Sequence, residues 1–455
     1  MDFDVIVVGA GPGGCVAAAG LAKAGFNVGL FDSNPRERIG KPIIIELEKS
    51  VFDEVGVSFP KPDEIPYKSN RTRVFSVNRK EAFSIESEHP GTAIYLDKFV
   101  LRLLKDAESS GARFYGNFKA VNPLIDSGGV VGAEFDETGR SHEIRAKLVI
   151  DATGYNATLV RNLGAELEIE FPDDSRDTVI AANYLHEIDE FKARKAVADG
   201  IQGDEETWSR LGFAGSYSTE YSHLSLRNRK AYILVGRKKE YDAPPVEKLI
   251  DDFIERRDYF GKRLYGGCGL IRISHSLDQL VADGFMVVGE AACQVIPMHG
   301  SGVASALYAG RLAATVSANA LKEGAPTISA LWPYSWLYQK GRGKLLATFD
   351  VSRLTVESFT MEQTARMMES GIMQAEDVYN AMIPQDPAMS LSSMPARIIG
   401  LAKNTNLIAP ILRMGFAAMA VKKLYSKYPS RYSASEFADW KREKARIFRP
   451  FRERD

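Results

Sequence analysis

The sequence predicts an α/β domain, a second β-rich domain and a helical C-terminal extension. At the N-terminus the apolar run "VIVV" leads into a glycine-rich turn and a small-residue helix, which is typical of a parallel strand buried on both faces. In the middle, "RTRVFSVNRKEAFSIE" indicates a hairpin with its turn at Asn78-Arg79, and "RKAYILVGR" indicates a sheet strand. A chain of 455 residues exceeds the size of one core, so two or three domains are expected.

The composition is that of a soluble globular protein, with 45% hydrophobic and 26% charged residues and a net charge of −1. Three scattered cysteines, Cys15, Cys268 and Cys293, suit neither a disulfide framework nor a metal knuckle and favour a reducing compartment. No basic segment precedes the first strand, and no uncharged apolar run reaches about 18 residues. We therefore expect a cytoplasmic protein without a signal peptide, a spanning helix, a metal site, a Ser-His-Asp triad or a nucleic-acid surface.

The segment "DVIVVGAGPGGCVAAAGLAKAGFNVGLFD" has the order strand, turn, helix, strand. Gly9 permits the turn, Gly11 lets the backbone approach a pyrophosphate, and Gly14 lets the helix pack against the strand. Phosphate charge is favourable at the N-terminus of the helix. Asp32 ends the second strand, where its carboxylate can bind ribose hydroxyls. The segment therefore predicts a Rossmann-like, dinucleotide-binding unit.

Two later segments extend this pattern. "AKLVIDATG" is a strand that ends at Asp151 to Gly154, and "DGFMVVGEAACQVIPMHGSG" is a strand that ends at Gly289-Glu290. The three parts together resemble the FAD-binding fold of the p-hydroxybenzoate hydroxylase type. This resemblance implies that Glu290 binds the ribityl chain and that the amides of Gly300, Ser301, Gly302 and Val303 face the pyrimidine edge of the flavin. An alternative is that Glu290 only caps the following helix.

Further segments cover nearly the whole chain, including "NPRERIGKPIIIELEKSVFDEVGV", "YLDKFVLRLLKDAESSGARF", "SALWPYSWLYQKGRGKLLATFD" and "KLYSKYPSRYSASEFADWKRE". They are similar to the archaeal geranylgeranyl reductase family. The resemblance implies an FAD-dependent reductase of isoprenoid double bonds in membrane ether lipids. By position, it implies FAD contacts at Gly13, Asp32, Ile43, Ile44, Lys98, Ala120, Glu290, Gly302 and Val303, in addition to the glycine turns at Gly9, Gly11, Gly14, Gly154 and Gly300.

The chain departs from that family at two motifs. Ile43 to Ile45 stand where the family has Cys-Gly-Asp, and Tyr-x-Trp-x-Phe-Pro is missing from the region that contains Tyr217, Tyr221 and His223. We predict His299, Tyr221 and His223 as acid or base groups, each with a purely structural role as the alternative. A flavin monooxygenase acting on an aromatic or isoprenoid substrate, and a non-catalytic flavin-bound lipid carrier, are the other functional hypotheses. The absence of Trp-x-Trp-x-Ile-Pro argues against a halogenase.

The predicted FAD domain is discontinuous, comprising residues 1–65, 91–175 and 276–345. The β-rich substrate domain comprises 66–90 and 176–275, and the helical part comprises 346–455. No second G-x-G-x-x-G follows a strand, so we expect a reductant that binds transiently, either a nicotinamide or a small electron-transfer protein.

The charge is concentrated at the C-terminal end. Residues 391–455 contain six lysines and eight arginines against five acidic residues, a net charge of +9, which leaves −10 for the other residues. Apolar helical stretches run between Arg397, Lys403, Arg413, Lys422 and Lys423. Two hypotheses stay open: a helical cap whose basic face is solvated, and a surface that contacts anionic lipid as a peripheral membrane protein.

Overall fold

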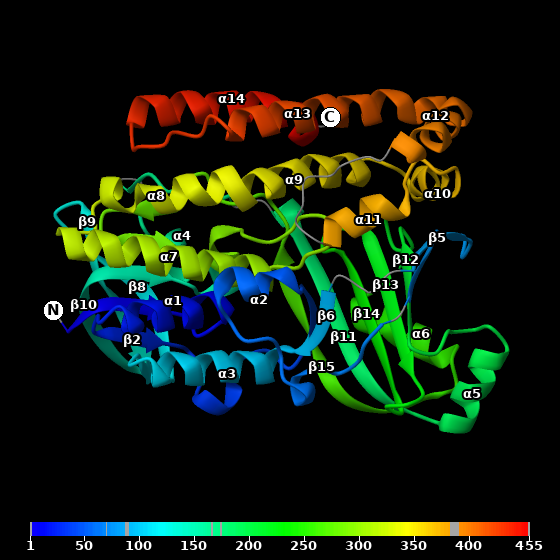
Figure 1. Cartoon of the computed structure of the whole chain (residues 1–455), viewed down its shortest axis with the longest axis horizontal. Coiled ribbons are helices and arrows are strands. Elements are labelled where there is room, and N and C mark those ends of the chain that lie inside the picture. Colours follow the sequence, from blue (N-terminus) through cyan, green and yellow to red (C-terminus); the bar gives the residue numbers. More distant parts are fainter. Residues whose placement is uncertain are drawn as a thin grey trace.

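The computed structural model describes residues 2–69, 71–86, 91–164, 167–172, 175–382 and 391–453. Figure 1 shows stacked helical layers over one sheet, with a second sheet beside them. The long helices are α1 (Pro12–Lys23), α3 (Leu96–Ser109), α7 (Val303–Glu323), α8 (Ile328–Tyr338), α9 (Lys344–Glu357), α13 (Ile408–Tyr425) and α14 (Ala434–Arg452). The shorter helices are α2 (Ser50–Val55), α4 (Thr158–Arg161), α5 (Glu190–Ala198), α6 (Val246–Glu255), α10 (Met361–Glu369), α11 (Ala375–Met382) and α12 (Met394–Lys403).

The first sheet contains five parallel strands in the order β17-β10-β1-β2-β7, with β16 antiparallel to β17 and with β8 and β9 attached to β10. The strands are β1 (Phe3–Val8), β2 (Val28–Phe31), β7 (Arg113–Tyr115), β8 (Phe118–Asp126), β9 (Gly129–Glu137), β10 (Arg140–Asp151), β16 (Val281–Ala282) and β17 (Phe285–Val287). In register, Val8 lies opposite both Phe31 and Asp151, and Asp151 lies opposite Val287. The three predicted motifs therefore meet at the carboxyl edge of this sheet.

Helices α1 and α7 pack closely because small residues line their contact. A Cβ atom at Gly13 would press on the backbone of Ala306, and one at Gly310 would collide with the carbonyl oxygen of Gly13. The alanine-rich sequence of α7 therefore serves the helix crossing, and this crossing places the N-terminus of α7 near the first glycine turn.

The second sheet has seven strands in the order β15-β11-β14-β13-β12-β4-β5. They are β4 (Arg71–Phe75), β5 (Glu81–Ile85), β11 (Thr178–Ile188), β12 (Glu206–Leu211), β13 (Ser218–Ser225), β14 (Lys230–Lys238) and β15 (Phe260–Arg272). The predicted hairpin is confirmed as β4 and β5, which pair antiparallel around Arg79, a residue with φ of 60°. Helix α6 covers one face, where Ile250 and Phe253 pack on Ile233 and Val235. The predicted domain limits stay a prediction, and residues 87–90 and 173–174 near two of them lie outside the described residues.

A two-stranded antiparallel sheet, β3 (Ile44–Glu48) with β6 (Gly91–Tyr95), lies between the two larger sheets. Ile44 contacts the second sheet through hydrogen bonds of its backbone with Asn183 and Tyr232. Leu47 instead belongs to the core of the first sheet. Successive side chains of β3 therefore point alternately toward the second sheet and toward the core of the first sheet.

The described residues beyond 346 are mainly helical, as predicted, and α13 and α14 form the outer layer in Figure 1. A buried ionic cluster attaches this layer: the fully buried guanidinium of Arg353 contacts Asp350 and Asp177, and Arg452 of α14 also contacts Asp177 at 2.7 Å. Several basic residues of the C-terminal region therefore have partners inside the protein, namely Arg397, Lys441, Lys444 and Arg452. Within the described part of the chain, no helix has the length and apolar character required to cross a membrane.

Candidate active site

The glycine turn after β1 has the backbone geometry that its sequence predicts. Gly9 has φ of +109°, and a Cβ atom there would collide with the carbonyl oxygen of Ala152. A Cβ atom at Gly14 would collide with the carbonyl oxygen of Gly9, whereas none of the surrounding atoms would lie within 4 Å of one at Gly11. Close packing therefore requires glycine at positions 9 and 14, whereas Gly11 borders open space at the N-terminus of α1. That end of the helix presents amide groups that favour an anion.

Asp32 lies at the end of β2, one strand away from this turn. Its carboxylate accepts a hydrogen bond from the Ala10 amide at 2.8 Å and another from the Asn34 amide at 2.8 Å. These bonds fix the carboxylate beside the glycine turn while the residue remains partly exposed. The arrangement fits a group that binds the hydroxyls of a ribose.

Asp151, in the second motif, orders a turn. It is fully buried, and its carboxylate accepts hydrogen bonds from the amide and hydroxyl of Thr153 and from the amides of Leu159 and Val160. Burial raises the pKa of Asp151, while these hydrogen bonds act in the opposite direction. The ordered turn leads to Gly154, which has φ of +68° and open space where a Cβ would lie.

Glu290, in the third motif, accepts a hydrogen bond from the Arg272 amide at 3.2 Å. Burial raises the pKa of Glu290, and Lys41 opposes that shift. Helix α7, which follows this segment, has Gly302 as its N-cap and no side-chain cap, so Glu290 does not cap it.

The loop before α7 uses part of its backbone internally. The Gly300 amide donates to the Ile296 carbonyl at 2.9 Å, and the Ser301 amide donates to Nδ1 of His299 at 3.3 Å. The first amides of a helix have no partner within that helix, which leaves Gly302 and Val303 as the better candidates for contact with a ligand.

Of the three predicted acid or base residues, Tyr221 contacts a carboxylate directly, that of Glu46 on β3. The Tyr221 hydroxyl donates a hydrogen bond to Glu46, and the Tyr67 hydroxyl donates a second at 3.5 Å. The ring of His223 stacks on Tyr67 with centroids 4.1 Å apart. Desolvation lowers the pKa of His299, although part of the residue reaches the surface, and the charge of Glu46 acts in the opposite direction. Sequence reasoning therefore found the surroundings of Glu46 and missed Glu46 itself.

Comparison with known proteins decides the family. Residues 2–230 match the FAD binding domain family. The chain belongs to this FAD-binding family. It is also 25% identical over 462 residues to the digeranylgeranylglycerophospholipid reductase of Sulfolobus acidocaldarius, covering 99% of this chain and 98% of that protein. The corresponding reductase of Methanoculleus marisnigri is 29% identical over 344 residues, which cover 73% of this chain and 81% of that protein.

Solved structures have the same fold. A geranylgeranyl bacteriochlorophyll reductase-like protein from Thermoplasma acidophilum has a TM-score of 0.70 at 20% identity, covering 89% of this chain and 99% of that one. A flavin-dependent brominase has a TM-score of 0.61 at 18% identity, covering 89% and 98%. These findings confirm the predicted fold class, the FAD cofactor and the resemblance to geranylgeranyl reductases.

The residues present fit FAD. The open space beside Gly11 and Gly154, the fixed carboxylate of Asp32 and the α7 N-terminus suit the pyrophosphate, the ribose and the flavin ring respectively. When bound and reduced, FAD supplies a hydride.

Four further predicted contacts have protein partners in the structure. Ile43 lies beside Gly267 of β15, and Ile44 is buried against the second sheet. Lys98 donates to the Asp63 carbonyl at 2.9 Å, and Ala120 lies buried opposite Phe135. Their contacts with FAD stay predictions.

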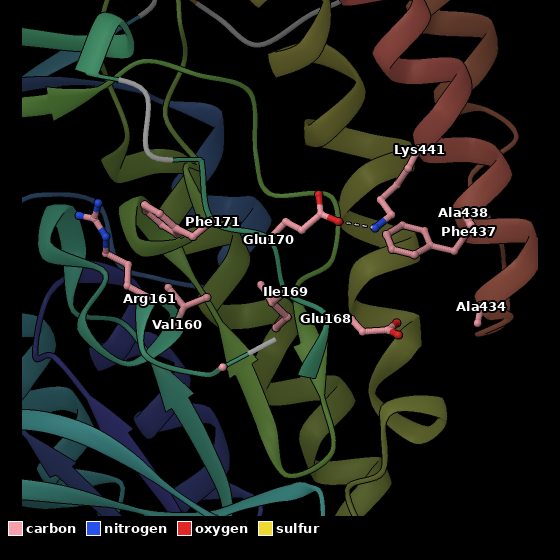
Figure 2. A pocket seen from close by; sticks show the side chains of 11 residues that line it. Val160, Arg161, Glu168, Ile169, Glu170, Phe171, Ala434, Phe437, Ala438 and Lys441 are labelled. Carbon is pink, nitrogen blue, oxygen red and sulfur yellow. Dashed lines mark hydrogen bonds and ion pairs between the residues drawn. The ribbon is translucent and has the colours of Figure 1, made fainter. Parts of the chain in front are cut away.

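A surface pocket of about 670 Å³ lies apart from these motifs, between the segment after α4 and helix α14 (Figure 2). An ion pair of 2.8 Å between Glu170 and Lys441 crosses it. Phe171 forms part of its wall and stacks on Arg272, whose amide binds Glu290. Gly11, Asp32 and Glu290 are not among its lining residues, so the reaction is not assigned to this pocket.

Proposed function

We propose that this protein reduces isoprenoid double bonds of a membrane ether lipid or a related prenyl compound, with FAD as the hydride carrier. The observation that carries this proposal is the similarity to digeranylgeranylglycerophospholipid reductases along 99% of the chain. That similarity includes the helical layer α8 to α14 as well as the FAD-binding part, so both parts of the molecule support the same activity.

The residues beside the predicted flavin site suit an apolar substrate. Ile43 and Ile45 pack against the core of the first sheet, and Ile44 packs against Tyr232 and Leu185 of the second. An apolar strand at this boundary excludes water and favours a prenyl chain by burial of apolar surface. The same strand also carries Glu46, whose carboxylate accepts hydrogen bonds from the Tyr67 and Tyr221 hydroxyls.

Anaerobic single-turnover mixing tests this function. Protein carrying reduced FAD is mixed with geranylgeranyl lipid in the absence of oxygen, and the flavin absorbance and the product mass are followed. A reductase reoxidises without oxygen, and its product gains two hydrogen atoms. Reoxidation that requires oxygen, with a product that gains an oxygen atom, indicates the monooxygenase. A lipid that binds without changing the flavin or itself indicates the carrier.

We further propose that the protein works in the cytoplasm, docks reversibly on the membrane surface and accepts electrons from a transiently bound nicotinamide or small electron-transfer protein. One exposed face of α13 supports docking, because Leu412, Phe416, Met419 and Lys423 recur at helical spacing and are all exposed. The opposite face is buried through Val421, Leu424 and Tyr425. Exposed Ile398 and Ile399 of α12 extend the apolar surface. An apolar face next to basic residues suits an anionic lipid surface.

Co-sedimentation with vesicles tests the docking. We expect binding to require anionic lipid, to weaken as salt rises, and to fall when Lys422 and Lys423 are both changed to Glu, because each basic residue near the surface adds about 1 kcal/mol. Phe416→Ser is expected to weaken binding as well. Phe191→Ser is the matched control, since Phe191 is 81% exposed and Phe416 is 65% exposed, but Phe191 lies on α5 at the far end of the molecule (Figure 1). Equal effects of the two serine variants would contradict docking through α13.

A further inference from the structure

Polar side chains lead from Glu46 to Glu205, which directly precedes β12 of the second sheet; the contacts as far as His223 are within hydrogen-bond distance, and the last one is a longer ionic contact. Tyr221 donates to Glu46, and the Tyr221 hydroxyl lies 3.3 Å from Oγ1 of Thr207. Oγ1 of Thr207 lies 3.4 Å from Nδ1 of His223, and Nε2 of His223 lies 3.9 Å from a carboxylate oxygen of Glu205. Each group in the series can both accept and release a proton.

The middle of this series is less exposed to solvent than its Glu205 end. The His223 side chain is 1% exposed, whereas the Glu205 side chain is 23% exposed. Thr207 is fully buried on β12, opposite His223 of β13. The series therefore passes from the partly exposed Glu205 through the buried side chains of His223 and Thr207 to Glu46, which is also partly exposed.

The inner end lies at the boundary with the flavin motif. The Ser301 hydroxyl donates to the backbone carbonyl of Glu46 at 3.5 Å, and Ser301 immediately precedes the Gly302-Val303 start of α7. Strand β3 therefore holds the Glu46 carboxylate between the second sheet and the loop predicted to face the flavin ring.

We propose that Glu205, His223, Thr207, Tyr221 and Glu46 form a proton relay that supplies the proton for double-bond reduction. This proposal rests on the proposed function. Saturation of one double bond needs a hydride at one carbon, which reduced flavin provides, and a proton at the other. The new C–H bond takes its proton from the Glu46 carboxyl group as that O–H bond breaks, and the O–H electrons stay on the carboxylate. A shift of one proton along the relay reprotonates Glu46, so the proton comes ultimately from water.

The groups that face Glu46 suit a relay. Burial and the charge of Glu46 raise the pKa of Tyr221 well above its ordinary value, so the phenol stays neutral and passes protons on. Burial and the charge of Glu46 also raise the pKa values of Tyr67 and Tyr232, and Tyr221 raises that of Tyr67 further. Among the described residues, the charge of Glu46 also acts on the pKa of His299. Burial also raises the pKa of Glu205 at the outer end.

Variants at two threonines separate the relay from its surroundings. Thr207→Val removes the middle hydroxyl and keeps the side-chain shape. Thr72→Val controls for the change of a buried threonine to valine, because Thr72 is also buried and lies opposite Thr207 on the adjacent strand β4. The Thr72 hydroxyl has no hydrogen-bond partner among the described residues, whereas that of Thr207 also donates to Ser69 at 2.9 Å. In anaerobic single turnover we expect Glu46→Gln to slow reduction by about 100-fold or more and Thr207→Val by about 10-fold, since positioned proton transfer contributes about 10²–10⁴-fold. Both variants should alter the pH profile, and Thr72→Val should not.

Infrared difference spectra of the FAD-free protein between low and high pH provide a second readout. We expect a carboxylic acid band that disappears in Glu46→Gln, and whose titration midpoint moves in Thr207→Val but not in Thr72→Val. Normal turnover and an unchanged pH profile in Glu46→Gln, or the absence of that band from the wild type, would overturn the relay alone. If the wild-type protein leaves the lipid unchanged, the proposed function is overturned. The relay would then have no double bond to supply with a proton.

Discussion

Two polar clusters in this molecule differ in the groups that contact their central charge. Around Arg353 a guanidinium meets three carboxylates: Asp350 at 2.6 Å, Glu357 at 2.7 Å and Asp177 at 2.8 Å. Around Glu46 a carboxylate accepts hydrogen bonds from the neutral hydroxyls of Tyr67 and Tyr221. The first cluster joins the helical layer to the rest of the chain, and the second lies between the two large sheets.

The phenol hydroxyls around Glu46 can release and accept a proton, whereas the guanidinium of Arg353 keeps its protons. Burial alone would raise the pKa of Asp350, but Arg353, His275 and Arg452 outweigh it and hold that pKa far below its ordinary value. A carboxylate fixed in this way keeps its charge over the working range of pH and serves structure. The Glu46 carboxylate accepts hydrogen bonds from the Tyr67 and Tyr221 hydroxyls, and hydroxyl groups can both donate and accept a proton.

Removing the central cation should have the largest effect on stability. Arg353→Met leaves Asp350 and Asp177 buried without their main partner, and breaking a buried pair costs about 3–5 kcal/mol. We expect a large fall in the urea midpoint. Arg366→Met provides the control, because Arg366 pairs with Glu362 on an exposed face of α10, where a pair contributes about 0–1 kcal/mol. Similar midpoints for the two variants would show that the cluster does not hold the fold.

Asp32 belongs to neither cluster, since its carboxylate is fixed for a ligand. Asp32→Ala should weaken FAD binding by about 1–3 kcal/mol, because ribose hydroxyls lose their acceptor. This loss corresponds to about a 5- to 150-fold rise in Kd. Titration of the FAD-free protein by flavin fluorescence measures it, with exposed Asp126→Ala as the control. Unchanged affinity in Asp32→Ala would remove Asp32 from the site.

The smallest expected effect concerns pH and His275, whose Nδ1 donates to the Asp350 carboxylate at 2.6 Å and whose Nε2 lies 3.0 Å from Nζ of Lys444. Burial first, and then Lys444, lower the pKa of His275, while Asp350 acts in the opposite direction. The folded protein therefore binds this proton less readily than the unfolded chain. Its contribution to stability is present above the unfolded value of about 6.5 and declines as pH falls toward the folded pKa.

Melting temperatures at pH 7, 6 and 5 measure this decline. His275→Asn keeps a side-chain nitrogen near Asp350 but does not titrate, so the loss of stability between pH 7 and pH 5 should be smaller than in the wild type. The same loss in both proteins would assign the acid sensitivity to other groups.

The local parts of the FAD site were predictable from the residue types alone. The turn at Gly9 needs a positive φ and close backbone packing, and these demands act within a few residues, so the residue types reveal them. The motif ends were also predictable, because parallel strands place their carboxyl ends at one edge of a sheet, as Val8 and Asp151 do. The helical character of the C-terminal part and the hairpin around Arg79 are likewise local properties.

Contacts between side chains that are far apart in the sequence depend on the tertiary structure. Tyr221 reaches Glu46 across 175 positions of sequence, and Arg353 reaches Asp177 across 176. Neither contact leaves a pattern along the chain, because each depends on how two sheets or two layers pack. Nothing in the sequence "IIIELEKS" distinguishes Glu46 from the other acidic residue there; its contact with Tyr221 forms only when β3 packs against the second sheet. The position of a carboxylate between two domains follows from packing, which is a property of the whole fold.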